Sequence, residues 1–200
     1  CGISPNDINE NVYKEIEEIE KIARDDKVLA IGEIGLDYYW NKDNKQLQKD
    51  VFSKQIDIAN KLNLPIVIHS RDAWIDTIDV LKSNPVDKKG VFHCCQLNQE
   101  LIKEALKLDF YISFSGNITF KNAKSDECIK LVPDNKILIE TDSPYLSPEP
   151  FRGTRNNSLN VKLVAKKIAE VKGMDIQDIA NITKENTMRI FMEGKKYDKV

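Results

Sequence analysis

The sequence has 200 residues, 41% of them hydrophobic and 31% charged, with a formal net charge of −2. Such a chain is expected to form one soluble globular domain with a full-sized core. The charge gives no basic surplus from which nucleic-acid binding could be inferred. No apolar run is long enough to cross a bilayer, and no signal-peptide pattern is present, so no membrane association is expected.

The four cysteines lack CxxC spacing, and two of them are adjacent. We interpret them as reduced thiols of a cytoplasmic protein. Cys94 and Cys95 follow a histidine and could suggest zinc. Adjacent cysteines rarely bind one ion together, so packing is the preferred interpretation.

Helical and strand patterns alternate along the whole chain. Apolar residues at helical spacing predict helices near residues 12–23, 47–62, 73–82, 99–108, 123–131, 159–172 and 176–191. Short apolar runs predict strands at 28–31, 65–68, 90–92, 110–114 and 137–139, and residues 1–3 resemble the end of another. Asp175 is a plausible N-cap for the last helix. This alternation predicts βαβ units and a parallel sheet.

Polar residues with metal-binding side chains follow four of these strands. Glu33 follows the first strand, His69 and His93 follow the next two, and Glu140 and Asp142 follow the last. The chain contains no other histidine. Side chains from the carboxyl ends of many strands converge in a closed barrel, so a barrel is favoured over an open sheet. A barrel needs eight strands and usually about 250 residues, so roughly the first two and a half βα units are expected to be missing.

Two imidazoles with two carboxylates form a mixed ligand set for Mg²⁺, Mn²⁺ or Zn²⁺. If Glu33 bridged two ions, they could promote displacement at phosphorus, with Asp142 as a ligand, a proton acceptor or both. Other interpretations stay open. A histidine at a strand end is often a hydrogen-bonded rim residue, Glu33 could pair with a lysine, and Asp142 could bond the turn at Ser143.

Further residues near the strand ends could contact a substrate. Arg71 and Arg152 could grip phosphate or form surface ion pairs. Ser115 and Ser143 could donate hydrogen bonds to phosphate or merely turn the chain. The aromatic residues after the first strand could stack on nucleobases or pack against a neighbouring loop; they are Tyr38, Tyr39 and Trp40.

Several motifs, in order along the chain, resemble the TatD family of metal-dependent hydrolases. They are Gly32-Glu-Ile-Gly-Leu-Asp-Tyr38, Leu64-Pro-Ile-Val-Ile-His-Ser-Arg-Asp-Ala73, the His-Cys pair at 93–94, Ile112-Ser-Phe-Ser-Gly116, Glu140-Thr-Asp-Ser-Pro144, Arg152-Gly-x-Arg-Asn156 and Asn186-Thr-x-x-x-Phe191. The resemblance covers essentially the whole chain. It implies a TIM-type (β/α)8 barrel of the amidohydrolase-like superfamily, of which residues 1–200 form a single partial domain.

The resemblance also implies a function and a ligand set. The function is that of a divalent-metal deoxyribonuclease, a 3′–5′ exonuclease on single-stranded DNA, with two ions (Mg²⁺ or Mn²⁺ first, then Zn²⁺) and no obligate protein partner. Glu33 would bridge the ions, His69 and His93 would bind one, and Asp142 would bind the other and assist the water.

The sequence departs from the family pattern at its start. The HxH motif of the family's first strand is absent, so the ion on the Asp142 side would lack its two imidazoles. Ser4 stands where the family's Gly-x-His-Pro turn has histidine. Two alternatives therefore remain: a metal-dependent deacylase acting on an ester such as aminoacyl-tRNA, and an inactive fragment.

Overall fold

The computed structural model describes residues 1–193 and contains five strands and seven α-helices there. The strands are β1 (Ile31–Asp37), β2 (Ile66–Arg71), β3 (Gly90–Phe92), β4 (Tyr111–Phe114) and β5 (Ile137–Ile139). The helices are α1 (Val12–Ile22), α2 (Lys45–Leu62), α3 (Trp74–Ser83), α4 (Gln99–Lys107), α5 (Ser125–Leu131), α6 (Val161–Lys172) and α7 (Ile176–Thr187). Short helical turns follow β4, precede β5 and α6, and extend α7 to Met192.

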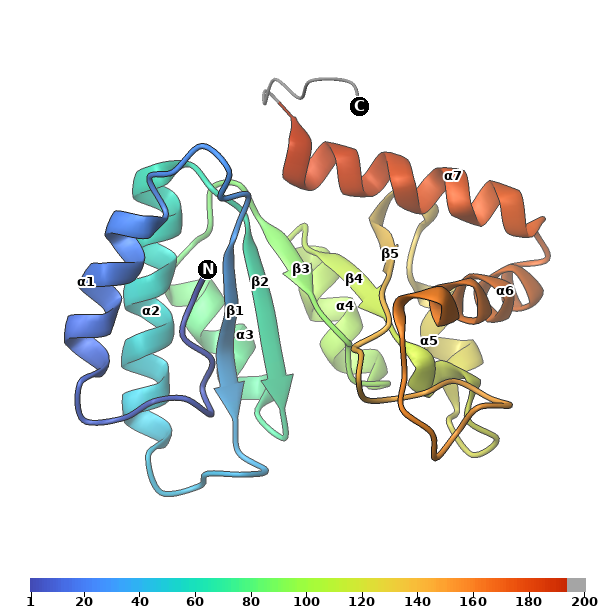
Figure 1. The fold of residues 1–200 in the computed structure, drawn as a ribbon, viewed down its shortest axis with the longest axis horizontal. Helices are drawn as coiled ribbons and strands as arrows, with labels where there is room; N and C mark the ends of the chain where they lie inside the picture. The colour runs from blue at the N-terminus through green and yellow to red at the C-terminus, as the bar shows by residue number, and fades with distance from the viewer. Residues whose placement is uncertain (194–200) are drawn as a thin grey trace.

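The five strands form one parallel sheet in the order β1-β2-β3-β4-β5. Each neighbouring pair is joined by a crossover that contains a helix, and Figure 1 shows these helices arranged around the strands. The predicted alternation of strands and helices is therefore confirmed. All five carboxyl ends of the strands lie at one edge, where β/α proteins place their functional side chains.

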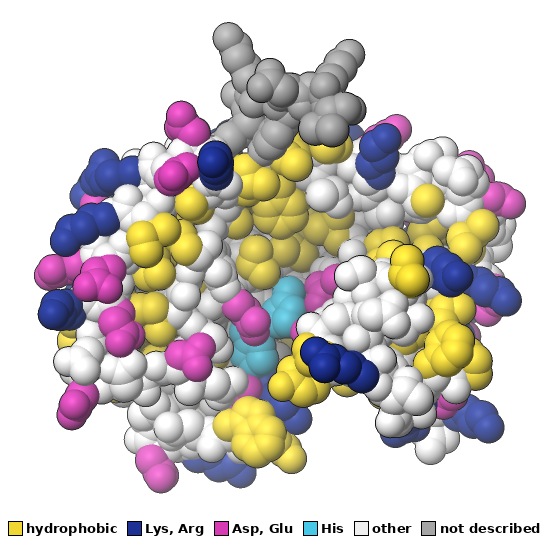
Figure 2. Space-filling model, in the orientation of Figure 1, with side chains coloured by type: hydrophobic (Ala, Val, Ile, Leu, Met, Phe, Trp, Pro, Cys, Tyr) yellow, Lys and Arg dark blue, Asp and Glu magenta, His cyan; other side chains and the backbone are white. Residues whose placement is uncertain are grey.

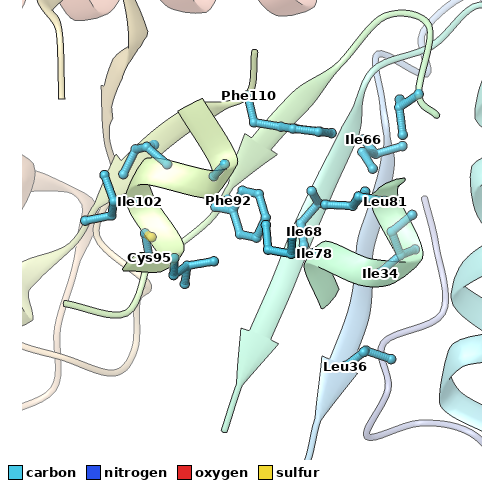
Figure 3. Packing of buried hydrophobic residues seen from close by; sticks show 14 of the residues in the cluster. Ile34, Leu36, Ile66, Ile68, Ile78, Leu81, Phe92, Cys95, Ile102 and Phe110 are labelled. Carbon is cyan, nitrogen blue, oxygen red and sulfur yellow. The ribbon is translucent and has the colours of Figure 1, made fainter. Parts of the chain in front are cut away.

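The main core lies between the sheet and the surrounding helices (Figure 3). Alternate strand residues such as Ile68, Phe92 and Ile112 point outward into it and are fully or almost fully buried. Phe92 packs edge-on against Phe110, with ring centroids 5.6 Å apart. Burial of side chains of this size contributes about 1.5–3 kcal/mol each, so this layer fixes the positions of the strands.

The other strand residues face the opposite, inner side of the sheet. Val91, Tyr111 and Leu138 form a smaller cluster there, with Val67 and Phe191 packed against it. Because side chains alternate along a strand, the residues two positions further along face the same side. This alternation directs the side chains of His69, His93 and Glu140 to the inner side at the carboxyl edge.

Some predicted boundaries were wrong. The first strand begins at Ile31 rather than at residue 28, and it runs through Glu33 and Gly35 to Asp37. β3 and β5 match their predicted bounds. Asp175 is confirmed as the N-cap of α7, since its side chain accepts a hydrogen bond of 2.7 Å from the backbone N–H of Gln177.

The first residues run beside β1 without being part of a strand. The amino group of Cys1 donates to the carbonyl of Ala30 (3.2 Å), and its carbonyl accepts from the N–H of Gly32 (2.8 Å). The buried side chain of Gln55 in α2 bonds both backbone groups of Ile3, at 2.7 and 3.0 Å. All four cysteines are free thiols. Among residues 1–193, no helix combines the length and apolar character that a bilayer crossing requires.

Candidate metal centre

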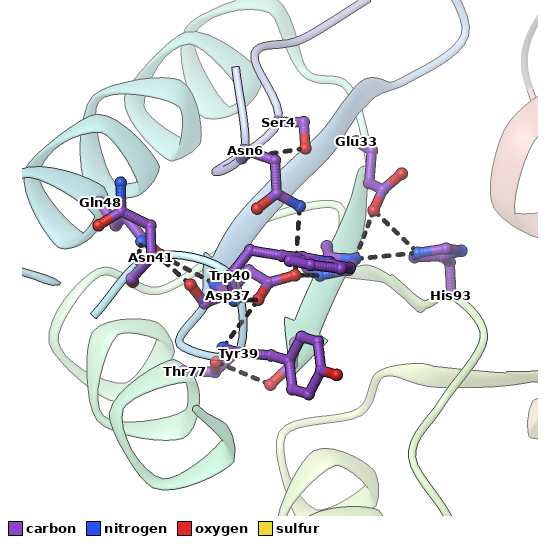
Figure 4. Close-up of polar contacts among 12 residues, drawn as sticks. Ser4, Asn6, Glu33, Asp37, Tyr39, Trp40, Asn41, Gln48, Thr77 and His93 are labelled. Carbon is purple, nitrogen blue, oxygen red and sulfur yellow. Dashed lines mark hydrogen bonds and ion pairs between the residues drawn. The ribbon is translucent and has the colours of Figure 1, made fainter. Parts of the chain in front are cut away.

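Glu33, His69 and His93 form a tight triangle at the carboxyl ends of β1, β2 and β3. Glu33 Oε1 lies 2.6 Å from Nδ1 of His69 and 2.9 Å from Nε2 of His93. The two nitrogens are 3.4 Å apart (Figure 4). Two nitrogens that bind one ion at about 2.0–2.1 Å stand roughly 2.9–3.4 Å apart at ordinary bond angles. The arrangement therefore fits one divalent cation, and Figure 2 shows both histidines in a hollow of the surface.

A second carboxylate lies behind each imidazole. Oδ2 of the fully buried Asp37 is 2.8 Å from Nε2 of His69, and Nδ2 of Asn6 donates to the same oxygen at 3.2 Å. Glu140 Oε1 is 3.1 Å from Nδ1 of His93. Such partners fix the tautomer and ring orientation of a metal-binding histidine. Each ring thus has one nitrogen held by a supporting carboxylate and the other directed at Glu33.

Asp142 lies near His93 and Glu140. The side chains of Asp142, Glu140 and His93 offer ligand atoms within 4.8 Å of one another, which is a second group that could hold a cation. Asp142 adopts a left-handed backbone conformation (φ 55°), and its carbonyl accepts a hydrogen bond from the N–H of Tyr145. Within residues 1–193 its carboxylate forms no hydrogen bond or ion pair, so it is free to bind a cation or a water molecule.

The charges of the cluster shift its protonation. Burial opposes ionisation of Glu33, but hydrogen bonds from His69 and His93 outweigh burial and hold the pKa of Glu33 well below its usual range. Burial likewise disfavours the charged form of His93, but Glu140 and Glu33 raise its pKa to about 10. Burial, together with repulsion from Glu140 and Glu33, raises the pKa of Asp142. A cation that takes the place of the imidazole proton would meet ligand atoms already in position.

The cluster combines four carboxylates with two imidazoles. The carboxylates belong to Glu33, Asp37, Glu140 and Asp142, and they surround the rings of His69 and His93. With neutral imidazoles, four carboxylates carry four negative charges, which two divalent ions would neutralise. Concentrated negative charge in a partly buried site is costly without such compensation.

Comparison with known proteins also indicates a metal-binding protein. A family model described as TatD related DNase matches residues 1–192. The chain is 45% identical over 192 residues to YabD of Bacillus subtilis, an uncharacterized metal-dependent hydrolase, covering 95% of this chain and 75% of YabD. It is 40% identical over 193 residues to the similarly named YcfH of Escherichia coli K12, covering 96% and 72% of the two chains.

The chain belongs to the TatD family. The crystal structure of YjjV, a TatD homologue from E. coli K12, superposes with a TM-score of 0.88 at 25% identity, covering 96% of this chain and 75% of that one. A TatD-family hydrolase from Entamoeba histolytica superposes with a TM-score of 0.79. The five-stranded parallel sheet is thus part of the expected TIM-type, amidohydrolase-like fold, and the protein is a metal-dependent hydrolase of the TatD family.

The residues expected to contact substrate fall into two groups in the structure, those at the surface and one that is buried. The guanidinium of Arg71 lies 3.9 Å from the ring centroid of Tyr39, and that of Arg152 lies 4.3 Å from the centroid of Phe120. Ser143 is exposed, and its hydroxyl donates to Oγ1 of Thr141.

Ser115 has internal partners instead. It is fully buried, and its hydroxyl donates to Oδ1 of Asn117 at 3.1 Å and lies 3.0 Å from Sγ of Cys94. A phosphate on the surface cannot reach this hydroxyl without a change in the loop. Ser115 therefore stabilises the turn after β4.

Asn156 and Gly35 were not predicted as site residues. The buried Asn156 amide donates to the carbonyls of Thr141 (2.7 Å) and Tyr145 (2.6 Å), on both sides of Asp142. A Cβ atom at Gly35 would stand 2.0 Å from the carbonyl oxygen of His69, so only glycine lets β1 approach His69 this closely. Both residues lie within motifs that resemble the family, and this membership was the only sequence feature that could have identified them.

Proposed function

We propose that the chain hydrolyses phosphodiester bonds of DNA in a reaction that requires divalent metal ions. The observation that carries the proposal is the triangle of Glu33, His69 and His93, which shares His93 with a second ligand group that contains Asp142. The description of the matching family as TatD related DNase supports DNA as the substrate. We propose two ions, Mg²⁺ or Mn²⁺, and a 3′–5′ exonuclease acting on single strands.

The side chains divide into two sets of roles. Glu33, His69 and His93 would hold one ion and Asp142 the other, with Glu33 between them. When bound, the ions supply positive charge that acidifies a water molecule and offsets the charge of the phosphate. One carboxylate oxygen of Asp142 would hold the ion and the other would accept the proton of the attacking water; proton transfer of this kind contributes about 10²- to 10⁴-fold to a rate.

Supporting residues keep these groups in place. Asp37 and Glu140 orient the two imidazoles so that a nitrogen of each faces Glu33. Arg71 is the last residue of β2 and Arg152 lies on the loop after β5, and both could bind the phosphates on either side of the scissile bond. The polypeptide thus presents the ligands and the proton acceptor around one point.

The test compares the protein with a His69→Ala/His93→Ala variant. Calorimetric titration with Mn²⁺ should show binding that the variant loses. Hydrolysis of a single-stranded oligonucleotide should require Mn²⁺ or Mg²⁺ and should be lost in the variant. A 5′ label should report progressive shortening, and a 3′ label should be released in the first step. Tyr13→Ala, an exposed residue of α1 remote from the site, is the matched control and should retain both properties.

Two outcomes would overturn the proposal. Metal binding without cleavage of any oligonucleotide, together with metal-dependent hydrolysis of an aminoacyl ester, would make the protein a deacylase. Cleavage that persists in the double-histidine variant would show that the activity does not belong to this site.

A further inference from the structure

An arginine stacked on two exposed aromatic rings lies at the carboxyl edge, beside the candidate metal centre. Tyr39 and Trp40 are 49% and 68% exposed, and their rings meet edge to face with centroids 4.8 Å apart. The guanidinium of Arg71 lies 3.9 Å from the centroid of Tyr39 and 5.6 Å from that of Trp40. Single exposed apolar side chains are common on protein surfaces, but adjoining exposed aromatic rings form a contiguous patch of the kind that marks binding sites.

Among the residues that the structure describes, the Arg71 guanidinium has no acidic partner. Within residues 1–193 it forms no ion pair and no hydrogen bond, and it stacks on the two aromatic rings. By contrast, Arg24 is paired with Glu20 at 2.9 Å. A guanidinium stacked on a ring keeps its N–H groups at the edge, where they can bind phosphate oxygens. The Arg71–Tyr39–Trp40 cluster therefore offers both aromatic faces and an available cation.

This cluster is fixed to the metal centre through Asp37. Oδ1 of Asp37 accepts hydrogen bonds from the backbone N–H groups of Tyr39 (2.9 Å) and Trp40 (3.1 Å), while its Oδ2 contacts His69. Figure 4 shows Tyr39 and Trp40 on the turn next to Asp37. Arg71 follows His69 by two residues and pairs with Asp37 in the sheet register. The turn that carries the two aromatic residues and the imidazole of His69 are thus held by the same carboxylate.

We propose that the Arg71–Tyr39–Trp40 cluster is a nucleobase platform, on which an unpaired base of the DNA stacks while its phosphodiester lies at the metal centre. This proposal rests on the proposed function and adds to it the residues that select single-stranded over double-stranded DNA. A stacked base must leave its partner strand, so the platform selects single strands. Arg71 contacts the adjoining phosphate, and the exposed indole of Trp40 contributes the main base contact.

The test measures binding rather than cleavage. A Trp74→Phe background makes Trp40 the sole tryptophan of the chain, which has two. Its fluorescence is followed during titration with single-stranded oligo(dT) in EDTA, where no turnover occurs. We expect quenching of Trp40 emission on binding. In fluorescence anisotropy with labelled oligo(dT), Trp40→Ala should bind about 5- to 150-fold more weakly, the range for loss of one stacked base, and Trp40→Phe should restore part of the affinity.

Two controls separate stacking from charge. An abasic oligomer of the same length carries the phosphates without bases, and its weaker binding should not change in Trp40→Ala. Tyr13 is also an exposed ring beneath a cation, since Lys54 Nζ lies 5.6 Å from its centroid. Tyr13→Ala should bind oligo(dT) like the parent protein. Because the Trp40 side chain is largely exposed, the thermal melt of Trp40→Ala should match that of the parent.

The outcomes for the platform and for the hydrolase are distinct. Equal affinity of Trp40→Ala and its parent for oligo(dT), or an equal loss with the abasic oligomer, would overturn the platform. A protein that cleaves single-stranded oligonucleotides with Mn²⁺, but whose Trp40→Ala variant binds oligo(dT) as tightly as the parent, would overturn the platform alone. A protein that binds oligo(dT) through Trp40 but cleaves no phosphodiester would overturn the proposed hydrolysis and leave the platform in place.

Discussion

The two sides of the candidate metal centre are built in different ways. On one side, Glu33 and His69 lie within strands of the sheet and His93 directly follows one, and each imidazole is backed by a second carboxylate. On the other side, Asp142 lies on an irregular loop, in a left-handed conformation, with no partner for its carboxylate within residues 1–193. The strand side is preorganised by the sheet, whereas the loop side depends on Asn156.

This difference suggests a division of labour. Groups fixed by strands and by buried partners pay little reorganisation energy when they bind an ion. A free carboxylate on a loop is suited to accept a proton and to adjust to the substrate. The strand side is therefore expected to determine metal affinity, and the loop side to determine the rate of the chemical step.

Asp142→Asn is expected to have the largest effect on turnover. The amide cannot accept the proton of the water, so oligonucleotide hydrolysis should fall about 10²- to 10⁴-fold. Titration with Mn²⁺ should still show binding on the strand side, with the stoichiometry reduced from two ions to one. Near-normal cleavage by this variant would exclude the assigned role, and complete loss of Mn²⁺ binding would show that the two sides are not separable.

Asp37→Asn should weaken metal binding without abolishing it. An amide can hold His69 less firmly and can select the wrong tautomer, and loss of such a partner costs about 10- to 100-fold in metal affinity. Calorimetry with Mn²⁺ measures the effect. The matched control is Asp76→Asn, because Asp76 is a carboxylate bonded to Tyr38 (2.7 Å) and Lys49 (2.7 Å) rather than to a histidine. An equal effect of both substitutions would argue against the role of Asp37.

Asn156→Ala should affect the loop side alone. The substitution removes both hydrogen bonds that hold the loop around Asp142, so turnover should fall about tenfold while Mn²⁺ affinity on the strand side is retained. The free energy of unfolding should fall by about 1–3 kcal/mol. Asn98→Ala is the control for stability: it removes the cap of α4, which accepts from Glu100 and Leu101, at a cost of about 1 kcal/mol and without change in turnover per folded protein.

Ser115→Ala should have the smallest effect. Because the hydroxyl is buried and donates to Asn117, its loss should reduce stability by about 1 kcal/mol and leave oligonucleotide affinity unchanged. Thermal melts and anisotropy titrations measure the two quantities. A loss of affinity without a loss of stability would restore Ser115 as a phosphate contact and would require the loop after β4 to rearrange.

The sequence predicted most of the fold because apolar periodicity reports burial directly. The runs at β3 and β5 contain only apolar residues and glycine, and their bounds matched. β1 was placed too early because its inner-face positions hold Glu33, Gly35 and Asp37, which resemble a loop when the sequence is read alone. All three lie against His69 of the neighbouring strand, and no local sequence pattern contains that contact.

For the candidate site, the sequence predicted the ligand residues but not the residues that support them. The order of strand ends was sufficient to expect Glu33, His69, His93 and Asp142 near one another, and the structure places them there. The supporting role of Asp37 was not predicted, although it shares strand parity with Glu33. The contacts of Asn156 join segments 11 and 15 residues apart through side-chain bonds to irregular backbone, and such pairings have no periodic signature.

If nucleic acid binds at the proposed platform, the bonds that Asp37 makes to both parts of the site would link the binding of metal ion and nucleic acid thermodynamically. One oxygen of this carboxylate bonds the imidazole and the other bonds the turn that carries Tyr39 and Trp40. If Mn²⁺ changes the affinity for oligo(dT) by some factor, oligo(dT) must change the affinity for Mn²⁺ by the same factor. With positive linkage of this kind, the metal centre would bind its ions most tightly when substrate is present. Fewer metal sites would then be filled in the absence of substrate.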